Sequence, residues 1–142
     1  MNRSDLIIRP YADEDETDVV ALWRSVFPND PPWNDPPQII RRKREFQREL
    51  FLVGELDGRV VATVIVGYDG FRGWIYHLAV AKTEQRRGHG RAMMVEAERR
   101  LKALGCAKIN LQVRAANAEV IEFYKALGYG IEDHTCFGKL LD

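Results

Sequence analysis

The sequence predicts a single mixed α/β domain over residues 1–142, and its composition, strand signals and helix signals all support this fold class. The chain is 46% hydrophobic and 30% charged, a composition that can bury a core and that disfavours disordered or fibrous proteins. Asp57-Gly58, between two runs rich in β-branched residues, indicates a tight hairpin. Apolar residues recur at helical spacing elsewhere. The sequence has no repeat, linker or low-complexity tract that would divide it.

The first part of the chain is expected to contain a strand, a helix, a loop and a second helix. Leu6 to Pro10 predicts a short strand that proline ends. The apolar spacing from about Asp15 to Phe27 predicts a helix. Residues 28–37 contain five prolines, so this stretch is expected to be a loop, and it carries Trp33 in an exposed place. A helical pattern resumes from Ile39 to Leu50.

The second predicted helix has a strongly basic face, formed by Arg41, Arg42, Lys43, Arg44 and Arg48. One interpretation is a phosphate-binding surface, and the other is a solvated helix face partly balanced by Glu45 and Glu49. Because charge runs on helices usually face water, the solvated face is favoured. An interaction protein built on this helix is disfavoured by the zero net charge.

The middle of the chain alternates between strands and turns before a long helix. Phe51 to Leu56 and Arg59 to Val66 form the predicted hairpin, and Tyr68 to Gly73 form a second turn. Trp74 to Val80 predicts another strand, and about Gly88 to Leu104 predicts the helix. The apolar face of that helix comprises Met94, Ala97, Leu101 and Leu104, and Gly105 ends it.

The last part of the chain is expected to add a strand, a short helix and an extended tail. Lys108 to Val113 alternates like a half-buried strand. Val120 to Leu127 predicts a helix closed by Gly128, and Tyr129 to Phe137 predicts a final extended region.

Charge, hydropathy and cysteine content exclude several classes of protein. Lys+Arg and Asp+Glu number 21 each, whereas proteins that bind nucleic acid through a broad surface usually carry excess positive charge. The longest apolar stretch, Val60 to Val66, is far shorter than the roughly 20 residues that span a bilayer. The N-terminus lacks the apolar region of a signal peptide, and Cys106 and Cys136 form no disulfide framework. The expectation is a cytoplasmic protein with no nucleic-acid or membrane partner.

The segment Gln85-Arg86-Arg87-Gly88-His89-Gly90-Arg91 lies between a predicted strand and the long helix. A helix N-terminus leaves about four backbone N–H groups without internal partners, and the macrodipole adds roughly half a positive charge there. The two glycines remove Cβ atoms that would keep a phosphate from these amides, and the arginines add cationic donors. The segment therefore suits a diphosphate, although an ordinary loop with a glycine N-cap gives the same pattern.

Other nucleotide and metal motifs do not fit. A dinucleotide-binding loop requires a third glycine where this chain has Met93. A P-loop requires four residues between its glycines and a Gly-Lys-Ser/Thr ending. His77, His89 and His134 share no metal-ligand spacing with the cysteines, so no metal site is expected.

Two motifs resemble those of the GNAT N-acetyltransferases. Leu78-Ala79-Val80, followed by Gln85-x-x-Gly88-x-Gly90 and a helix, is similar to that family's acyl-CoA-binding motif. Residues 117–129, which include Asn117, Phe123-Tyr124 and Gly128-Tyr129, are similar to its second motif. The resemblance implies a GNAT fold: a central, mostly antiparallel twisted sheet, flanked by helices, splayed at the acyl-CoA site and completed by final strands. Short phrases around Trp33-Asn34-Asp35-Pro36 and Gly67-Tyr68-Asp69-Gly70 further resemble a YpeA-like bacterial subgroup.

The resemblance implies acetyl-CoA as co-substrate. Backbone groups of the Leu78–Val80 strand would pair with the pantetheine arm, and the amides of residues 86–91 would bind the pyrophosphate. Asn117 would contact the pantetheine region, with a plain helix cap as the open alternative. Tyr124 would protonate the departing thiolate, while Phe123 fits the core. The implied cofactor residues are Leu78, Ala79, Val80, Gln85, Arg86, Arg87, Gly88, His89, Gly90, Arg91 and Asn117, with Tyr124 as the catalytic residue.

The reaction implied is direct transfer of the acetyl group to a primary amine of a small-molecule or peptide acceptor. Family acceptor clefts are formed by the early helices with their loop, the turn before the cofactor strand, and the C-terminal strands. This places as candidates Trp33, Asn34, Asp35, Tyr68, Asp69, Phe71, Trp74, Tyr76 and His77. Asp35 and Asp69 would favour a cationic acceptor, unless they only form turns.

The general base, the activity and the assembly are left open. Tyr76, His77, Asp69 and a water relay are the candidates for the base, and the imidazole has the best-matched unperturbed pKa, about 6.5. A non-catalytic acyl-CoA-binding or sensing module is the rival to an enzyme. A homodimer is compatible with the sequence.

Overall fold

The computed structural model describes residues 5–141, which divide into two compact units. The first unit ends at Leu111 and contains the β-sheet. The second begins at Gln112 and contains one short helix followed by the C-terminal tail. Each unit is described by itself.

The sheet of the first unit has five strands, and strands that follow one another in the chain are neighbours in the sheet. They are β1 (Ile7–Pro10), β2 (Phe51–Leu56), β3 (Arg59–Tyr68), β4 (Gly73–Val80) and β5 (Ile109–Leu111). The first four pair antiparallel, and β5 runs parallel to β4. Asp57 (φ 50°) and Gly58 (φ 80°) are both left-handed and form the predicted tight turn between β2 and β3. The predicted mixed α/β class with a mostly antiparallel sheet is confirmed.

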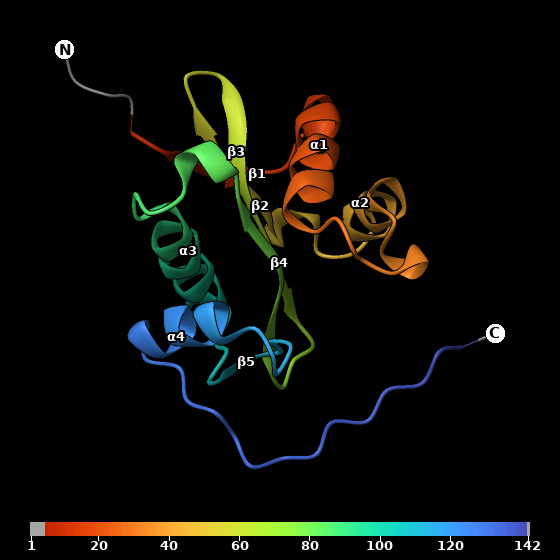
Figure 1. The fold of residues 1–142 in the computed structure, drawn as a ribbon, viewed down its shortest axis with the longest axis vertical. Coiled ribbons are helices and arrows are strands. Elements are labelled where there is room, and N and C mark those ends of the chain that lie inside the picture. The colour runs from red at the N-terminus through yellow and green to blue at the C-terminus, as the bar shows by residue number, and fades with distance from the viewer. Residues whose placement is uncertain (1–4, 142) are drawn as a thin grey trace. The chain divides into compact units, whose positions relative to one another are not determined.

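Helices cover both faces of this sheet, as Figure 1 shows. α1 (Glu16–Val26) and α2 (Pro36–Arg44) lie on one side, and α3 (His89–Ala103) lies on the other. The core beneath α1 and α2 contains Trp23, which stacks on Phe51 with ring centroids 5.9 Å apart. On the other face, α3 buries Met93, Met94, Ala97 and Leu101. The prediction that Leu104 belongs to this buried face is wrong: it caps the helix and is half exposed.

The second predicted helix differs from the observed one at both ends. α2 begins at Pro36, inside the predicted loop, because proline is tolerated in the first turn of a helix, where its missing N–H has no partner to lose. The helix ends at Arg44, and Gln47 adopts a left-handed conformation (φ 53°) that interrupts the helical path. Residues Arg48–Leu50 form a separate single 3₁₀ turn. The prolines at 31 and 32 lead into another short 3₁₀ turn, Pro32–Asn34.

The basic face of α2 is only partly a solvated surface. Arg41 and Arg42 are exposed, as expected. Lys43, however, is half-buried and donates a hydrogen bond to the carbonyl of Val66 at 2.6 Å, and burial lowers its pKa to about 8. Arg44 and Arg48 both form ion pairs with Asp13. The charge run therefore ties α2 and the following turn to neighbouring elements.

The second unit contains α4 (Ala118–Ala126), which Gly128 (φ 95°) follows as predicted. Residues 129–141 have no regular secondary structure, so the expected final strands are wrong for this segment. Its large apolar side chains, Ile131, Phe137, Leu140 and Leu141, are exposed, so this segment buries none of the apolar surface that would hold it in a sheet. The strand predicted from Lys108 to Val113 is also shorter in the structure, where β5 spans three residues.

Candidate active site

The segment before α3 has the backbone geometry of an anion-binding loop. Arg86 (φ 64°) and Gly88 (φ 84°) are both left-handed, and Gly88 is the N-cap of the helix. The amide of Ala92 donates to the carbonyl of Gly88 at 3.0 Å, so the amides of residues 89–91 precede the hydrogen-bonded turns. Within the described chain, no side chain caps this helix end. Successive amides in such a loop form a concavity suited to phosphate oxygens.

Gly88 is required by its backbone conformation. A Cβ atom built at this position would meet open space, with nothing within 4 Å. The positive φ is the condition that favours glycine here, because other residues rarely adopt it. The same open space means that a larger side chain at this position would extend over the amides that follow.

Two side chains of the loop hold its shape. The amide of Gln85 donates to the carbonyl of Val80 at 2.9 Å, which ties the loop to the end of β4. The guanidinium of Arg87 lies 3.4 Å from the carboxylate of Glu84. Gln85 and Arg87 therefore both help to hold the loop in position, whether or not they also touch a ligand.

The remaining cationic groups of the loop differ in exposure. Arg86 and Arg91 are exposed and lie on either side of the N-cap in sequence. The Nε2 atom of His89 is buried and has no hydrogen-bond partner among the described residues, with the Glu84 carboxylate 3.9 Å away. An unpartnered buried nitrogen at the first helical position is a group that a ligand could satisfy.

The sheet opens at the same end of β4. The pairing of β4 with β5 runs from Gly73 to Ile75 and then stops, whereas β4 continues to Val80. In the first unit, the last five residues of β4 therefore extend beyond the β5 ladder on that edge. An unpaired strand edge can accept an extended ligand as an added strand.

The direction of the β4 backbone determines which groups border the opening. The amide of Ala81 donates to Val61 of β3 at 2.8 Å. Because backbone groups alternate along a strand, Ala79 also directs its backbone to β3, and Val80 directs its backbone to the opposite edge. Leu78 lies between Ala79 and a β-bulge, where the register shifts and His77 is left-handed (φ 50°). The bulge interrupts the ladder in the middle of the strand.

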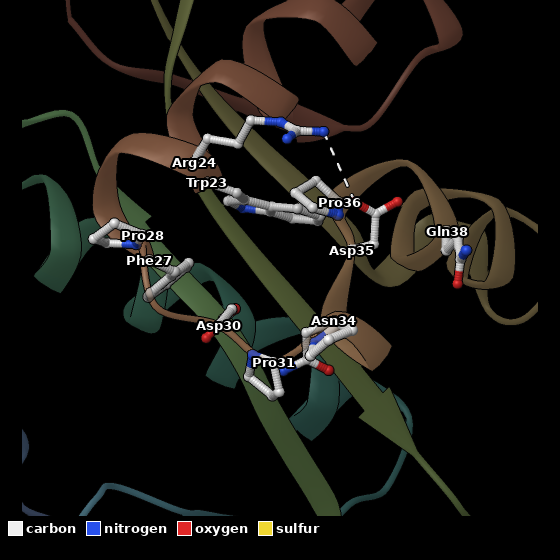
Figure 2. Close-up of a pocket in the computed structure, with 11 residues that line it drawn as sticks. Trp23, Arg24, Phe27, Pro28, Asp30, Pro31, Asn34, Asp35, Pro36 and Gln38 are labelled. Atoms are coloured by element: carbon white, nitrogen blue, oxygen red, sulfur yellow. Dashed lines mark ion pairs between the residues drawn. The ribbon is translucent and has the colours of Figure 1, made fainter.

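A hollow of about 540 Å³ lies beside α1. Its lining residues come from the end of α1, the proline-rich loop and the start of α2: Trp23, Arg24, Phe27, Pro28, Asp30, Pro31, Pro32, Asn34, Asp35, Pro36 and Gln38. Figure 2 shows the ion pair of Arg24 and Asp35, 3.8 Å long, on one side of the hollow, and Asp30 with Pro31 on the opposite side. The aromatic rings and prolines give it apolar walls with two carboxylates.

His77 contacts the wall of this hollow from β4. Its ring centroid lies 4.7 Å from that of Trp23 and 5.2 Å, edge-on, from that of Phe27. Its Nε2 atom is 3.6 Å from Oδ2 of Asp30. Burial lowers the pKa of His77 below its usual value of 6.5, and the neighbouring Asp30 carboxylate partly offsets that effect. The imidazole is therefore neutral at physiological pH.

The other predicted acceptor residues are distributed unevenly. Asn34 and Asp35 line the hollow, whereas Trp33 is exposed and does not. Asp69 accepts hydrogen bonds from the amides of Phe71 and Arg72 at 2.7 and 2.8 Å, which is the turn-forming role that the sequence left open. These bonds lower the pKa of Asp69, with that from Arg72 the stronger. The residues around this β3–β4 turn, including Tyr68, Phe71, Trp74 and Tyr76, are not among those that line the hollow.

Sequence reasoning missed the residues that build most of the hollow. Trp23 and Phe27 fit a helix core, and Trp23 is indeed almost fully buried. Asp30 stands among prolines and offers no motif of its own. A usable signal is the aromatic pair four residues apart at the end of α1, followed three residues later by a carboxylate. The contact between this carboxylate, Asp30, and His77, 47 positions further along the chain, can be seen only in the structure.

The second unit holds the two remaining predicted site residues. Asn117 is the N-cap of α4, and its Oδ1 accepts a hydrogen bond from the amide of Val120 at 3.3 Å, so the helix-cap interpretation is met. Tyr124 packs edge-on against Phe123 and Tyr129, with centroids 5.0 and 5.7 Å away. Phe123 was expected to occupy the core position, but Tyr124 is the more buried of the two. Burial raises the pKa of Tyr124 to about 12.

Residues 5–141 contain neither a cluster of metal-ligating side chains nor a membrane-spanning helix. No group of three or more His, Cys, Asp or Glu side chains is placed to hold a metal ion. No helix there combines the length and apolar character needed to cross a membrane.

Comparisons with known proteins agree with one another. Residues 17–129 match the model of the acetyltransferase (GNAT) family. An acetyltransferase of Yersinia pestis (strain Pestoides F) is 40% identical over 134 residues, which cover 94% of each chain. The crystal structure of Ard1 from Thermoplasma volcanium is similar in fold, with a TM-score of 0.79 at 24% identity, over 89% of this chain and 84% of that one.

A further solved structure is similar in fold over nearly the whole chain. It is AAC(6')-Iy in complex with the bisubstrate analog CoA-S-monomethyl-acetylneamine, with a TM-score of 0.77 at 14% identity, over 98% of this chain and 100% of that one. The family match covers most of the chain and spans both of its motifs, and the Yersinia relative aligns over 94% of each chain. The chain belongs to the GNAT acetyltransferase family.

Proposed function

We propose that the protein transfers an acetyl group from acetyl-CoA to a primary amine of a small-molecule or peptide acceptor. Support comes from family membership, from the anion-suited loop before α3, and from the apolar hollow with two carboxylates beside α1. The observation that carries the proposal lies at the end of β4: within the first unit, the strand edge beyond the β5 ladder leads directly into a loop whose helix N-terminus has no side-chain cap. The strand edge suits the extended pantetheine arm, and the loop suits a diphosphate.

Coenzyme A fits the residues at this end of the first unit. The amides of residues 88–91, with Arg86 and Arg91 beside them, would hold the diphosphate. The buried Nε2 of His89, which has no hydrogen-bond partner among the described residues, is a polar atom that a ligand at this site could satisfy. A CoA derivative is present in the AAC(6')-Iy structure, whose fold this chain shares. The bound thioester supplies an activated acetyl group, so the protein needs no nucleophile of its own.

Each β4 residue named from the sequence has a distinct part in this proposal. The backbone amide of Val80 faces the edge beyond the β5 ladder and would pair with the pantetheine arm, while its carbonyl already accepts from Gln85. The amide of Leu78, next to the bulge, would donate to the thioester carbonyl. A preorganised donor of this kind is commonly worth about 2.7–4 kcal/mol in the transition state. Ala79 bonds to β3 and keeps the strand in register.

The acceptor amine would bind in the hollow beside α1, with its ammonium group near Asp30 or Asp35. Once deprotonated, the amine nitrogen forms a bond to the acetyl carbon and the carbon–sulfur bond breaks. The overall change converts an ammonium ion and acetyl-CoA into an amide, a free thiol and one released proton. Apolar walls favour this step because they exclude water that would compete for the acetyl group.

Tyr124 is proposed as the acid that protonates the departing thiolate. The support is its place in the second motif and its raised pKa, which keeps the hydroxyl protonated at neutral pH. General-acid help of this kind is typically worth about 10²–10⁴-fold in rate. Asn117 is also proposed to contact the pantetheine arm, because the helix cap uses its side-chain oxygen and not its side-chain amide nitrogen.

Release of free thiol from acetyl-CoA in the presence of a panel of amines, peptides and polyamines tests the proposal. We predict amine-dependent turnover that falls about 10²–10⁴-fold in Tyr124→Phe, with unchanged affinity for CoA. Tyr129→Phe, which alters a neighbouring ring in the same unit, is the matched control and should retain the wild-type rate. A protein that binds CoA but turns over none of the amines would instead be the sensing module, the rival function.

Two finer proposals accompany this function. We further propose that the chain belongs to a YpeA-like bacterial subgroup, which the motif phrases around Trp33 and Tyr68 support. We also propose that its amine acceptor is not a nucleic acid, which the balanced charge supports. An assay panel that included polyamines, peptides and a nucleic-acid competitor would address the second proposal directly.

A further inference from the structure

The general base of the proposed reaction is the group that sequence reasoning left open, and His77 has the best surroundings for it. Its side chain is 13% exposed and touches Trp23, Phe27 and Asp30, all of which line the hollow. Its backbone is left-handed, a strained conformation for a residue other than glycine. Strained residues beside a cavity are candidates for function.

The backbone of His77 is fixed in place by a buried hydrogen-bond chain. The indole Nε1 of Trp23 donates to Oγ1 of Thr63 at 2.8 Å, and this hydroxyl donates to the carbonyl of His77 at 3.0 Å. Thr63 has no exposed surface. The chain links α1, β3 and the β4 bulge, so the direction of the imidazole is determined by rigid elements rather than by a loop.

The alternative bases are less suitable. The carboxylate of Asp69 is fully exposed and already accepts two backbone hydrogen bonds, which lower its pKa and weaken it as a base. Tyr76 is half exposed, and burial of the rest of its side chain raises its pKa, so its hydroxyl remains protonated at neutral pH. His77 is neutral at that pH and has one ring nitrogen able to accept a proton.

Asp30 connects His77 to the hollow. It lines the hollow and lies 3.6 Å from Nε2 of His77. The rings of Trp23 and Phe27 that pack against the imidazole are uncharged, and Asp30 is the charged group that affects its pKa. A carboxylate between an ammonium ion and an imidazole can hold both and can conduct a proton between them.

We propose that Asp30 binds the ammonium group of the acceptor and that His77 takes its proton, which makes this pair the proton acceptor of the transferase. The inference rests on the proposed function. One N–H bond of the ammonium breaks, its proton passes through the Asp30 carboxylate to Nε2 of His77, and the nitrogen keeps the electron pair with which it attacks. The resulting imidazolium lies beside a carboxylate and later releases the proton to solvent.

The walls of the hollow indicate the kind of amine. The rings of Trp23 and Phe27 and the prolines at 28, 31, 32 and 36 present apolar surface. Asp35 is paired with Arg24, so the Asp30 carboxylate is the group that selects positive charge. The acceptor is therefore a primary amine carried on an apolar body. Phenethylamine is a simple probe of this class, and taurine, whose amine is beside a sulfonate, is the matched negative probe.

His77→Asn is the variant that tests the inference, because asparagine tolerates the left-handed backbone. With phenethylamine, we expect kcat to fall about 10²–10⁴-fold, with unchanged CoA affinity by calorimetry. His134→Asn, at an exposed histidine, should remain within about twofold of wild type. The wild-type rate should also decline as pH falls through the lowered pKa of His77, below 6.5.

A measurement independent of turnover is the NMR titration of the His77 ring in the protein without ligands. We expect a midpoint below 6.5 that falls further in Asp30→Asn, because the carboxylate that favours the imidazolium is lost. Addition of phenethylamine, but not taurine, should perturb the same resonance.

Two results would overturn the inference, and a third addresses the underlying function. Turnover of His77→Asn within about threefold of wild type, with the acid limb preserved, would remove His77 as the proton acceptor. A His77 midpoint unaffected by Asp30→Asn and by phenethylamine would do the same without any assay of activity. Absence of turnover with every amine, alongside the expected NMR response, would instead reject the proposed transferase and leave an amine-binding pair.

Discussion

At the residue scale, the first unit depends on a few side chains that satisfy backbone or ionic groups far along the chain. Arg9 of β1 contacts Asp15 through two hydrogen bonds of 2.7 and 2.9 Å and also donates to Glu55 of β2 at 2.9 Å. Asp15 is almost fully buried and accepts the amide of Ala12 at 2.9 Å. The hydrogen bond with Arg9 is the largest effect that lowers the pKa of Asp15 below its usual 3.8.

This geometry predicts a pH-dependent contribution to stability. A carboxylate whose pKa is lowered in the folded state stabilises the fold above its unfolded pKa, and this stabilisation is lost as pH falls through the folded value. Asp15→Asn should therefore cost about 2 kcal/mol at pH 7 and give a shallower loss of stability below pH 3.8. Urea denaturation at pH 7 and across the acid range measures both effects.

Asp13→Asn is the control for this prediction. Its carboxylate also pairs with arginines, Arg44 and Arg48, but it is 60% exposed. Exposed ion pairs contribute less than about 1 kcal/mol. Equal losses of unfolding free energy in the two variants would show that burial does not make the Asp15 network more stabilising than an exposed ion pair.

At the element scale, local signals predicted most helices and strands because each signal lies within a few residues. The Asp57-Gly58 turn, the α1 spacing and the glycines that flank α3 are of this kind. The break in α2 at Gln47 was missed because the amide and carbonyl of Gln47's side chain bond to the backbone of Tyr68, 21 positions away. A contact of that separation has no local pattern.

The packing of α3 on the sheet gives the prediction for this scale. A Cβ at Gly73 of β4 would lie 2.8 Å from Cδ1 of the buried Leu101, so Gly73→Ala should overpack the interface and destabilise the protein by about 1–3 kcal/mol. In Gly67→Ala, on β3, the nearest atom to the new Cβ lies 4.0 Å away. Thermal denaturation should separate the two variants clearly, and similar melting temperatures would contradict the close approach of α3.

At the scale of the whole molecule, the sequence was a better guide to the loop before α3 than to the hollow beside α1. The loop residues are consecutive and stand before a helix, so a helix-terminus argument reaches them directly. The hollow assembles Trp23, Asp30 and Asp35, with His77 behind its wall, from three elements and a loop. The tail after α4 was predicted as strands from family resemblance, but its residues form no strand and its large apolar side chains are exposed.

If the loop before α3 binds a ligand, that binding should also change the stability of the molecule. A ligand that binds only the folded state raises its stability by RT ln(1 + [L]/Kd), which is about 2.7 kcal/mol at a hundredfold excess over Kd. If the amides before α3 bind the CoA diphosphate, CoA should raise the melting temperature, and a carboxylate placed over those amides should prevent it.

The most direct measurement is the binding of CoA to the wild type, Gly88→Glu and Gly70→Glu by calorimetry, with melting temperatures recorded alongside. Gly70 is the matched control, because it shares the left-handed backbone (φ 92°) and the open space for a side chain but lies in the β3–β4 turn. We predict that Gly88→Glu folds but neither binds CoA nor is stabilised by it, whereas Gly70→Glu behaves like wild type. Binding of CoA to Gly88→Glu with wild-type affinity would contradict the assignment of the diphosphate to this loop.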